Sequence, residues 1–293
     1  MNTTIANNSK PYGNFTLNRK GMIFFPKAKI NLGLRITGKR QDGFHDIETL
    51  FYPVSFSDAL EFVISADQNG KDILTTSGIN TGCIPEENIV YKAIVKLREK
   101  HEFPSLKIHL HKKIPAGAGL GGGSSDAAVV VKAVVKKFNL PSDAEDLKSL
   151  ALELGSDCPF FIDSMPAFAS GRGEILTPVN PVLKGYYIML ANPGVGINTQ
   201  EAYQNCIPQK PSTSLHQLAE YPVETWKKFI INDFEAFAFK KYPLIEEIKN
   251  EMYKAGALFS LMSGSGSSVY GIFTEDQKLS GMLKKYLIFR GLL

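Results

Sequence analysis

A glycine-rich segment that runs directly into a helix-forming stretch is the feature of this 293-residue chain that most restricts its fold. Residues 115–128 read PAGAGLGGGSSDAA, and five of the seven residues from Gly117 to Gly123 are glycine. Glycine reaches positive φ and leaves its backbone N–H open to an anion. A helix that starts near Ser124 would add unpaired N–H donors and a partial positive charge at its N-terminus. The segment therefore predicts a phosphate-binding loop.

Known phosphate-binding loops differ in the residues that they require. No GxxxxGK[ST] run is present, which excludes a Walker A loop. A loop of the Rossmann type follows the first strand of its fold, whereas this segment comes after more than 100 residues of mostly β-type sequence. The segment could instead be a flexible linker, or the start of a helix that binds no ligand. The hydroxyls of Ser124 and Ser125 could add contacts to a phosphate or to Mg²⁺.

The order of the predicted elements indicates the fold class. Apolar spacing predicts strands over 28–37, 48–54, 59–64, 106–111, 185–191, 258–262 and 269–274, and helices over 87–100, 124–138 and most of 199–255. Asp42-Gly43 predicts a tight turn, and Ser142 to Glu145 fits a capping box for a helix that ends near Gly155. A β-rich first half and a helix-rich second half predict an α+β fold with two closely packed lobes.

Composition narrows the possible functions. Lys and Arg total 33 and Asp and Glu total 29, so the net charge is 33 − 29 = +4. This charge suits a small anionic ligand and does not require nucleic acid. No run of about 18 apolar residues predicts a membrane span, and three widely spaced cysteines favour the reducing cytoplasm. Residues 1–21 are expected to be a disordered leader or tag that activity does not need.

Three segments resemble the GHMP kinases, a family of small-molecule kinases. Residues 115–125 are similar to the ATP-binding motif of that family, residues 26–32 (PKAKINL) to its N-terminal motif, and residues 261–267 (LMSGSGS) to its C-terminal glycine motif. Three motifs in the family's order are far more specific than any one of them. The resemblance implies an enzyme that uses ATP with Mg²⁺, with its active site in a cleft between two lobes.

The same resemblance implies how the chain divides. An N-terminal ATP-binding lobe similar to domain 2 of ribosomal protein S5 would cover 22–175, and a ferredoxin-like α/β substrate lobe would cover 176–293.

Further segments favour one branch of the family. Residues 42–45 (DGFH), 155–159 (GSDCP) and 171–174 (GRGE) are similar to members that phosphorylate the 2-hydroxyl of 4-diphosphocytidyl-2-C-methyl-D-erythritol (CDP-methylerythritol) in non-mevalonate isoprenoid biosynthesis. A GHMP kinase for homoserine or mevalonate would leave 42–45 unexplained. A non-catalytic nucleotide-binding homologue could have lost Lys29 or Asp157, and both are present. A monomer or a weak homodimer is expected.

Two residues are candidates for the chemistry. Phosphoryl transfer requires a positioned hydroxyl, a proton acceptor and charge compensation. From the sequence alone, Asp157 could be an ordinary turn residue, and Lys29 could extend its ammonium to solvent from an edge strand. The resemblance makes Asp157 the catalytic base and Lys29 a catalytic lysine that would lower the pKa of the Asp157 carboxyl and offset transition-state charge.

The resemblance also implies residues for the second substrate. Phe44 and His45 would stack on the cytosine and hydrogen-bond to it, although a lone His is commonly a surface residue. Asn31 would contact the substrate near the transferred group. The remaining candidates on the substrate side are Thr199, Tyr203, Ser263, Gly264, Ser265 and Gly266. The last four would otherwise form a plain glycine turn.

ATP is expected to bind along the glycine-rich segment. The candidate residues are Pro115, Gly117, Gly119, Leu120, Gly121, Gly122, Gly123, Ser124 and Ser125, with Asn88 and Lys112 near the adenine. Asn88 could instead be a helix-entry residue and Lys112 a solvated residue at a strand end. Asp126 is expected to interact with the helix dipole rather than with a metal. No protein residue is assigned as a metal ligand.

Overall fold

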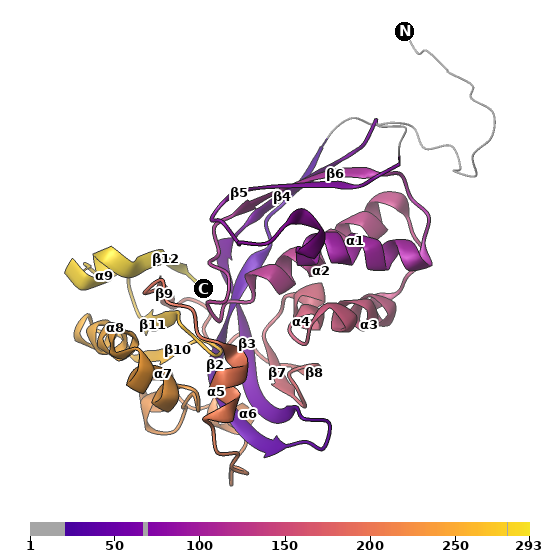
Figure 1. The fold of residues 1–293 in the computed structure, drawn as a ribbon. Helices are drawn as coiled ribbons and strands as arrows, with labels where there is room; N and C mark the ends of the chain where they lie inside the picture. Colours follow the sequence, from indigo (N-terminus) through magenta and orange to yellow (C-terminus); the bar gives the residue numbers. More distant parts are fainter. Residues whose placement is uncertain (1–20, 67–69, 280) are drawn as a thin grey trace, which may run out of the picture.

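The computed structural model describes residues 21–66, 70–279 and 281–293, so all but the last residue of the predicted leader lies outside the described residues. Strands of this part form three four-stranded sheets (Figure 1). The mixture of antiparallel sheets and separate groups of helices confirms the α+β class.

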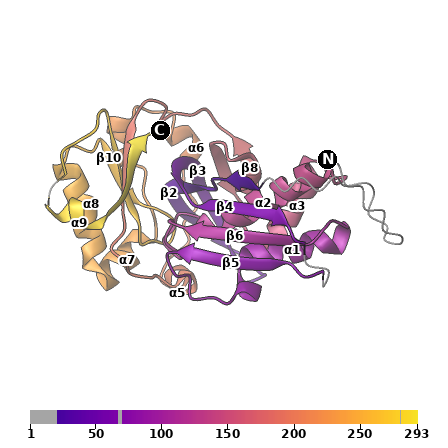
Figure 2. The ribbon, with the colours of Figure 1, turned by 90° about the horizontal axis from the view of Figure 1, so that it is seen from above.

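The first sheet has the strand order β1-β4-β6-β5. Its strands are β1 (Met22–Phe24), β4 (Ala59–Ile64), β5 (Ile73–Gly78) and β6 (Leu106–Lys112). Only the β5–β6 pair is parallel. Buried and exposed residues alternate along β6, since one face of the sheet packs on helices and the other lies open, as Figure 2 shows from above.

Helices cover the inner face of this sheet. The covering helices are α1 (Ile89–Lys100) and α2 (Gly122–Phe138), and the short 3-10 turn η1 (Pro85–Glu87) precedes α1. Two further helices, α3 (Ala144–Leu154) and α4 (Cys158–Asp163), pack beside them. The apolar stripe of α1 and most of the Ala/Val surface of α2 are buried against the strands. This packing fixes the N-terminus of α2 at one end of the sheet.

A long hairpin forms the second sheet. Its strands are β2 (Lys27–Lys39), β3 (His45–Ser57), β7 (Ala167–Ser170) and β8 (Ile175–Pro178), all antiparallel and in that order. The predicted turn at Asp42-Gly43 joins β2 to β3, and Gly43 has φ +85°. In Figure 1 this hairpin runs down the middle of the molecule, between the first sheet and the C-terminal elements.

The third sheet, with the order β10-β11-β9-β12, belongs to the C-terminal part of the chain. Its strands are β9 (Tyr187–Ala191), β10 (Phe259–Met262), β11 (Val269–Phe273) and β12 (Leu287–Leu292). The elements around it are α5 (Thr199–Gln204), α6 (Leu215–Leu218), η2 (Val223–Lys228), α7 (Glu235–Lys241), α8 (Pro243–Lys254) and α9 (Gly281–Tyr286).

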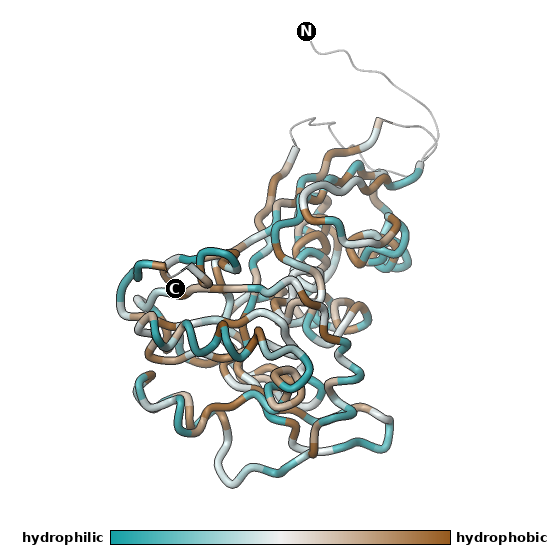
Figure 3. Tube along the Cα trace, turned by 60° about the vertical axis from the view of Figure 1, so that its left-hand side comes forward, coloured by the Kyte–Doolittle hydropathy of each residue, from teal (hydrophilic) through white to brown (hydrophobic). Residues whose placement is uncertain are grey.

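One apolar cluster joins the central hairpin to the third sheet. Ile30 and Leu32 of β2 pack with Trp226, Phe259 and Tyr270, and all five are buried. Figure 3 shows the complementary pattern, with hydrophilic segments in the outer turns of the trace. The predicted lobe boundary at 175 and 176 falls in β8, which pairs with β7, and the division stays a prediction. Within the described ranges, no helix is long and apolar enough to cross a membrane.

Some predicted details differ from the structure. The capping box at the start of α3 uses Asp143 and Asp146, one residue later than predicted, because Asp143 accepts the N–H groups of Glu145 and Asp146. Helix α2 begins at Gly122 instead of Ser124, so Asp126 lies beyond its first turn. The Asp126 side chain is buried and does not act as a surface partner of the helix dipole.

Candidate active site

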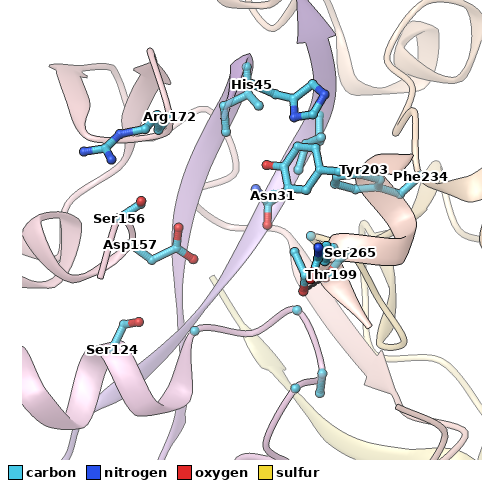
Figure 4. A pocket seen from close by; sticks show the side chains of 18 of the residues that line it. Asn31, His45, Ser124, Ser156, Asp157, Arg172, Thr199, Tyr203, Phe234 and Ser265 are labelled. Carbon is cyan, nitrogen blue, oxygen red and sulfur yellow. Dashed lines mark hydrogen bonds between the residues drawn. The ribbon is translucent and has the colours of Figure 1, made fainter. Parts of the chain in front are cut away.

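A cavity of about 1140 Å³ lies where the central hairpin, the glycine-rich segment and helices α4 and α5 meet. This volume exceeds the range of roughly 300–1,000 Å³ that is typical for one drug-sized ligand. Figure 4 shows Ser124, Ser156, Asp157 and Arg172 along one side of the cavity and the aromatic residues along the other, with Asn31 between them. The cavity is therefore large enough for more than one ligand, and Asn31 lies between its two sides.

The glycine-rich segment lines one end of this cavity. Gly117, Gly119 and Gly121 have φ values of +62°, +75° and +67°. Gly121 is the N-cap of α2 and no side chain caps this helix end. Helix N-termini without a protein cap offer their N–H groups to an anion. The predicted glycine-rich helix start is therefore present with its uncapped end at the cavity wall, and phosphate binding there stays a prediction.

Ser263 connects the three sequence motifs. Its hydroxyl donates to the carbonyl oxygen of Gly119 at 2.8 Å and accepts the N–H of Asn31 at 3.2 Å. The N–H of Lys29 donates to the carbonyl oxygen of Leu120 at 2.9 Å. Segments that are far apart in the chain are thus joined by hydrogen bonds behind the cavity wall.

Lys29 and Asp157 form an ion pair inside the cavity, with 3.3 Å between Nζ and Oδ2. The Lys29 side chain is 4% exposed and that of Asp157 is 35% exposed. Asp157 precedes α4 but makes no capping hydrogen bond, so its carboxylate is free to face the cavity (Figure 4). Lys29 Nζ also donates to Asn31 Oδ1 at 2.6 Å and lies 4.9 Å from the centre of the Phe51 ring.

Asn31 is oriented by its own buried partners. Its side-chain amide donates to the hydroxyl of Thr49 at 2.8 Å, and Thr49 donates in turn to the carbonyl oxygen of Gly33 at 2.6 Å. Because the Asn31 oxygen accepts from Lys29 and its nitrogen donates to Thr49, the amide orientation is fixed. Asn31 therefore holds the ammonium of Lys29 beside the carboxylate of Asp157.

Aromatic side chains form the opposite wall. The rings of His45 and Tyr203 stack with 4.8 Å between centroids, and Phe234 meets Tyr203 edge-on at 4.9 Å. Burial raises the pKa of Tyr203 to about 12, and the negative charge of Asp157 adds to this shift. Phe44 is instead 52% exposed, with the Arg172 guanidinium 4.9 Å from its ring centre. The arrangement is a flat apolar surface with a phenol that stays protonated.

Most of the predicted site residues line this cavity. They are Lys29, Asn31, Phe44, His45, Pro115, Gly117, Gly119, Gly121, Gly122, Gly123, Ser124, Asp157, Thr199, Tyr203, Gly264 and Ser265. The hydroxyls of Thr199 and Ser265 lie 3.0 Å apart and share a hydrogen bond, which ties α5 to the C-terminal glycine turn.

Other predicted residues lie behind the wall. Leu120, Ser125, Ser263 and Gly266 are buried. Asn88 is the N-cap of α1, and its Oδ1 accepts the N–H of Val90 at 2.9 Å. The Lys112 side chain is enclosed and its ammonium pairs with Asp58 and Asp126. Direct contacts of Asn88 and Lys112 with ATP stay predictions.

Sequence reasoning missed several residues that line the cavity. They are Lys39, Ser156, Arg172, Gln200, Gln204 and Phe234, among others. Arg172 and Ser156 lie inside segments that carried the resemblance, and that position was the available signal. No sequence signal indicated Phe234, because it belongs to a helical region that contains no motif.

The acidic groups limit where Mg²⁺ can bind. Among the described residues, no group of three or more His, Cys, Asp or Glu side chains could hold a metal ion. Asp157 is the only acidic side chain among the cavity-lining residues that the structure describes. Mg²⁺ commonly uses one or two carboxylates together with substrate phosphates, so this donor set fits a metal that arrives with a nucleotide.

Comparisons with known proteins agree with the geometry. The family model of the GHMP kinases N terminal domain matches residues 88–166, and that of the GHMP kinases C terminal region matches residues 223–286. The 4-diphosphocytidyl-2-C-methyl-D-erythritol kinase of Bacteroides fragilis is 48% identical over 261 residues, which are 89% of this chain and 95% of that protein. The enzyme of the same name from Parabacteroides distasonis is 48% identical over 87% of this chain and 92% of its own length.

A solved structure supports the same relationship. The crystal structure of a 4-(cytidine 5'-diphospho)-2C-methyl-D-erythritol kinase superimposes with a TM-score of 0.69 at 33% identity, covering 86% of this chain and 90% of that one. The predicted two-part GHMP kinase fold is thereby confirmed. On this evidence the chain is an ATP-dependent small-molecule kinase that belongs to the GHMP kinases and, within them, to the 4-diphosphocytidyl-2-C-methyl-D-erythritol kinases.

Proposed function

We propose that this chain transfers the γ-phosphoryl group of ATP to the 2-hydroxyl of CDP-methylerythritol, a step of isoprenoid precursor biosynthesis. The observation that carries the proposal is the Lys29–Asp157 pair, which lies in one cavity between the open N-terminus of α2 and an aromatic wall. A kinase needs a donor site, an acceptor site and a proton acceptor between them.

The phosphates of ATP would lie against the N-terminus of α2. Gly122, Gly123 and Ser124 line the cavity there, and glycine allows a phosphate oxygen to approach the backbone closely. The partial positive charge of the helix end favours the polyphosphate. Ser124 adds a hydroxyl that faces the cavity (Figure 4).

The acceptor hydroxyl would lie between Asp157 and the γ-phosphate. Its oxygen attacks phosphorus, the bond from phosphorus to the bridging oxygen of ADP breaks, and the hydroxyl proton passes to the Asp157 carboxylate. The Lys29 ammonium lies beside that carboxylate and offsets the charge that develops on the transferred group. Both residues are already within 3.3 Å of one another, so little rearrangement is needed.

The cytidine diphosphate part of the acceptor would lie along the aromatic wall. A pyrimidine can stack on Tyr203 or His45, with Phe44 at the rim. Arg172 and Lys39 also line the cavity, and their charges suit the diphosphate linkage. Thr199 and Ser265 would contact the same substrate where α5 meets the C-terminal glycine turn.

We further infer that Mg²⁺ accompanies ATP and would be held mainly by the phosphates, because the Asp157 carboxylate is engaged by Lys29 and by the hydroxyl proton. The ion would neutralise part of the phosphate charge during transfer. We also infer a cytoplasmic enzyme that acts as a monomer or a weak homodimer. The free state of Cys83, Cys158 and Cys206 supports a reducing compartment.

A coupled ADP-release assay tests the proposed function. The purified chain with MgATP should turn over CDP-methylerythritol and should leave homoserine and mevalonate unchanged. Nuclear magnetic resonance of the product phosphorus should show a new phosphomonoester on the 2-oxygen. Turnover of homoserine or mevalonate alone would assign the chain a different acceptor, and nucleotide binding without turnover of any acceptor would favour a non-catalytic homologue.

A further inference from the structure

A buried ion cluster lies directly beneath the glycine-rich segment. The ammonium of Lys112 pairs with Oδ2 of Asp58 and, at 2.6 Å, with Oδ2 of Asp126. The three side chains are 4%, 0% and 1% exposed. Charged groups are buried this completely only when they are paired, so the cluster acts as a unit.

Each member of the cluster comes from a different structural element. Asp58 lies between β3 and β4, Lys112 is the last residue of β6, and Asp126 lies in α2. Asp58 Oδ1 also accepts the backbone N–H groups of Lys113 and Ile114, at 2.5 and 2.9 Å. These two residues lead into the glycine-rich segment, and α2 follows that segment. The cluster therefore ties down both ends of it.

Lys112 lies close enough to the segment to control its position. A methyl group added at Gly122, the first residue of α2, would lie 3.4 Å from Lys112 Nζ. Oδ1 of Asp126 has no hydrogen-bond partner among the described residues. Lys112 is thus the counter-charge that neutralises Asp126, and no second contact of the carboxylate replaces it in this part of the chain.

We propose that Lys112, through Asp58 and Asp126, is a positioning residue that holds the glycine-rich segment and the first turn of α2 in the geometry that binds the phosphates of ATP. This inference rests on the proposed function, because it takes that segment as the ATP site. It assigns Lys112 an indirect role. An ammonium that reached out to ATP would leave two buried carboxylates without a partner, which is strongly unfavourable.

Asp126→Ala is the most informative variant. It removes the link between the cluster and α2 but leaves Lys112 and Asp58 as a neutral buried pair, so the fold should persist. We expect the KM for ATP and the Kd for MgADP to rise at least tenfold, with the KM for CDP-methylerythritol within twofold of wild type. Asp126→Asn should restore most of the nucleotide affinity, because its side-chain oxygen can still accept from Lys112.

Lys113→Met is the matched control. Lys113 follows Lys112 in the chain and is exposed. Its replacement removes one lysine charge from the surface beside the glycine-rich segment and leaves the Lys112–Asp58–Asp126 cluster intact. Its nucleotide affinity should stay within twofold of wild type at 0.15 M salt, where exposed charges are well screened.

Calorimetric titration of MgADP separates this inference from the proposed function. A wild-type chain that binds MgADP but does not turn over CDP-methylerythritol would refute the function and leave the positioning role testable by the Kd. The positioning role is overturned if Asp126→Ala lowers the melting temperature or kcat while the nucleotide Kd stays within twofold. It is also overturned if Asp126→Asn fails to restore affinity or if Lys113→Met weakens binding equally.

Discussion

Gly119 and Ser263 touch so closely that no side chain fits between them. A methyl group on Gly119 would lie 1.9 Å from the carbonyl oxygen of Ser263, and Gly119 also has φ +75°. The Ser263 hydroxyl donates to the carbonyl oxygen of the same glycine at 2.8 Å. This contact joins the glycine-rich segment to the C-terminal glycine turn, and both of these segments line the cavity.

Gly119→Ala should therefore disrupt the site. A residue with a Cβ costs about 1–2 kcal/mol in the left-handed region, and here the backbone of two segments must also separate. We expect a clear loss of unfolding free energy in urea and a loss of most kinase activity. Gly117→Ala is the control, because Gly117 has φ +62° but open space around its missing Cβ. Equal effects of the two variants would contradict the importance of the contact with Ser263.

Asp157→Asn tests the proton acceptor. The amide keeps the shape of the side chain but cannot take the hydroxyl proton, so turnover should fall by roughly 10²–10⁴. The Kd for MgADP should stay within a few fold. Steady-state kinetics and calorimetry provide the two measurements. Asp163 is the last residue of α4 and pairs with Lys148 at the surface. The control variant Asp163→Asn should therefore leave turnover nearly unchanged. Near-normal turnover of Asp157→Asn would remove Asp157 from this role.

Tyr203→Ala tests the aromatic wall. Stacking of a base on an aromatic ring contributes about 1–3 kcal/mol, so the KM for CDP-methylerythritol should rise by roughly 10–100-fold while the KM for ATP changes little. Tyr203→Phe keeps the ring and should stay close to wild type. The wall has no role in binding cytidine if Tyr203→Ala leaves the KM for CDP-methylerythritol unchanged, or if both substrates are weakened equally.

The cysteines should differ in reactivity. Burial raises the pKa of the Cys158 and Cys206 thiols to about 11 each, so both are almost entirely protonated at pH 7.5. Cys83 is exposed. Iodoacetamide labelling followed by mass spectrometry should modify Cys83 first and Cys158 last. Cys206 lines the cavity, so CDP-methylerythritol should slow its modification further. Rapid labelling of Cys158 in the folded chain would contradict this order.

Asp126 should make stability depend on pH. Burial raises the pKa of its carboxyl from 3.8 to about 7, with Asp58 adding to the shift and Lys112 opposing it. Between these values the folded chain binds a proton that the unfolded chain does not, so this group favours folding at low pH and loses that effect as pH rises through about 7. The unfolding free energy of Asp126→Asn relative to wild type should increase by about 1–3 kcal/mol from pH 5 to pH 8.

Urea titrations of both proteins at pH 5, 6.5 and 8 provide the measurement. Titrating groups outside the Lys112–Asp58–Asp126 cluster are shared by the two proteins, so the difference between them reports how Asp126 titrates within this cluster. Parallel curves at all three pH values would mean that Asp126 keeps an ordinary pKa.

Much of the local structure follows from the sequence. The alternation in residues 59–64 and 106–111 and the helical spacing in 87–100 predicted β4, β6 and α1 almost to the residue, because burial on one face requires those spacings. The short strands β7, β8 and β12 were not predicted. β7 and β8 have only four residues each, and buried and exposed residues do not alternate along most of β12, so no clear period marks these strands.

The site, like the fold, was predictable from the sequence only in part. The sequence by itself determined that a glycine-rich loop precedes a helix, since φ preferences and helix ends depend on neighbouring residues. Only the tertiary structure decided which side chains meet. Lys112 pairs with Asp58, 54 positions away, and Ser263 reaches Gly119, 144 positions away. Such contacts form because packing removes these groups from water and leaves each with few available partners. Local spacing carries no information about which partners those are.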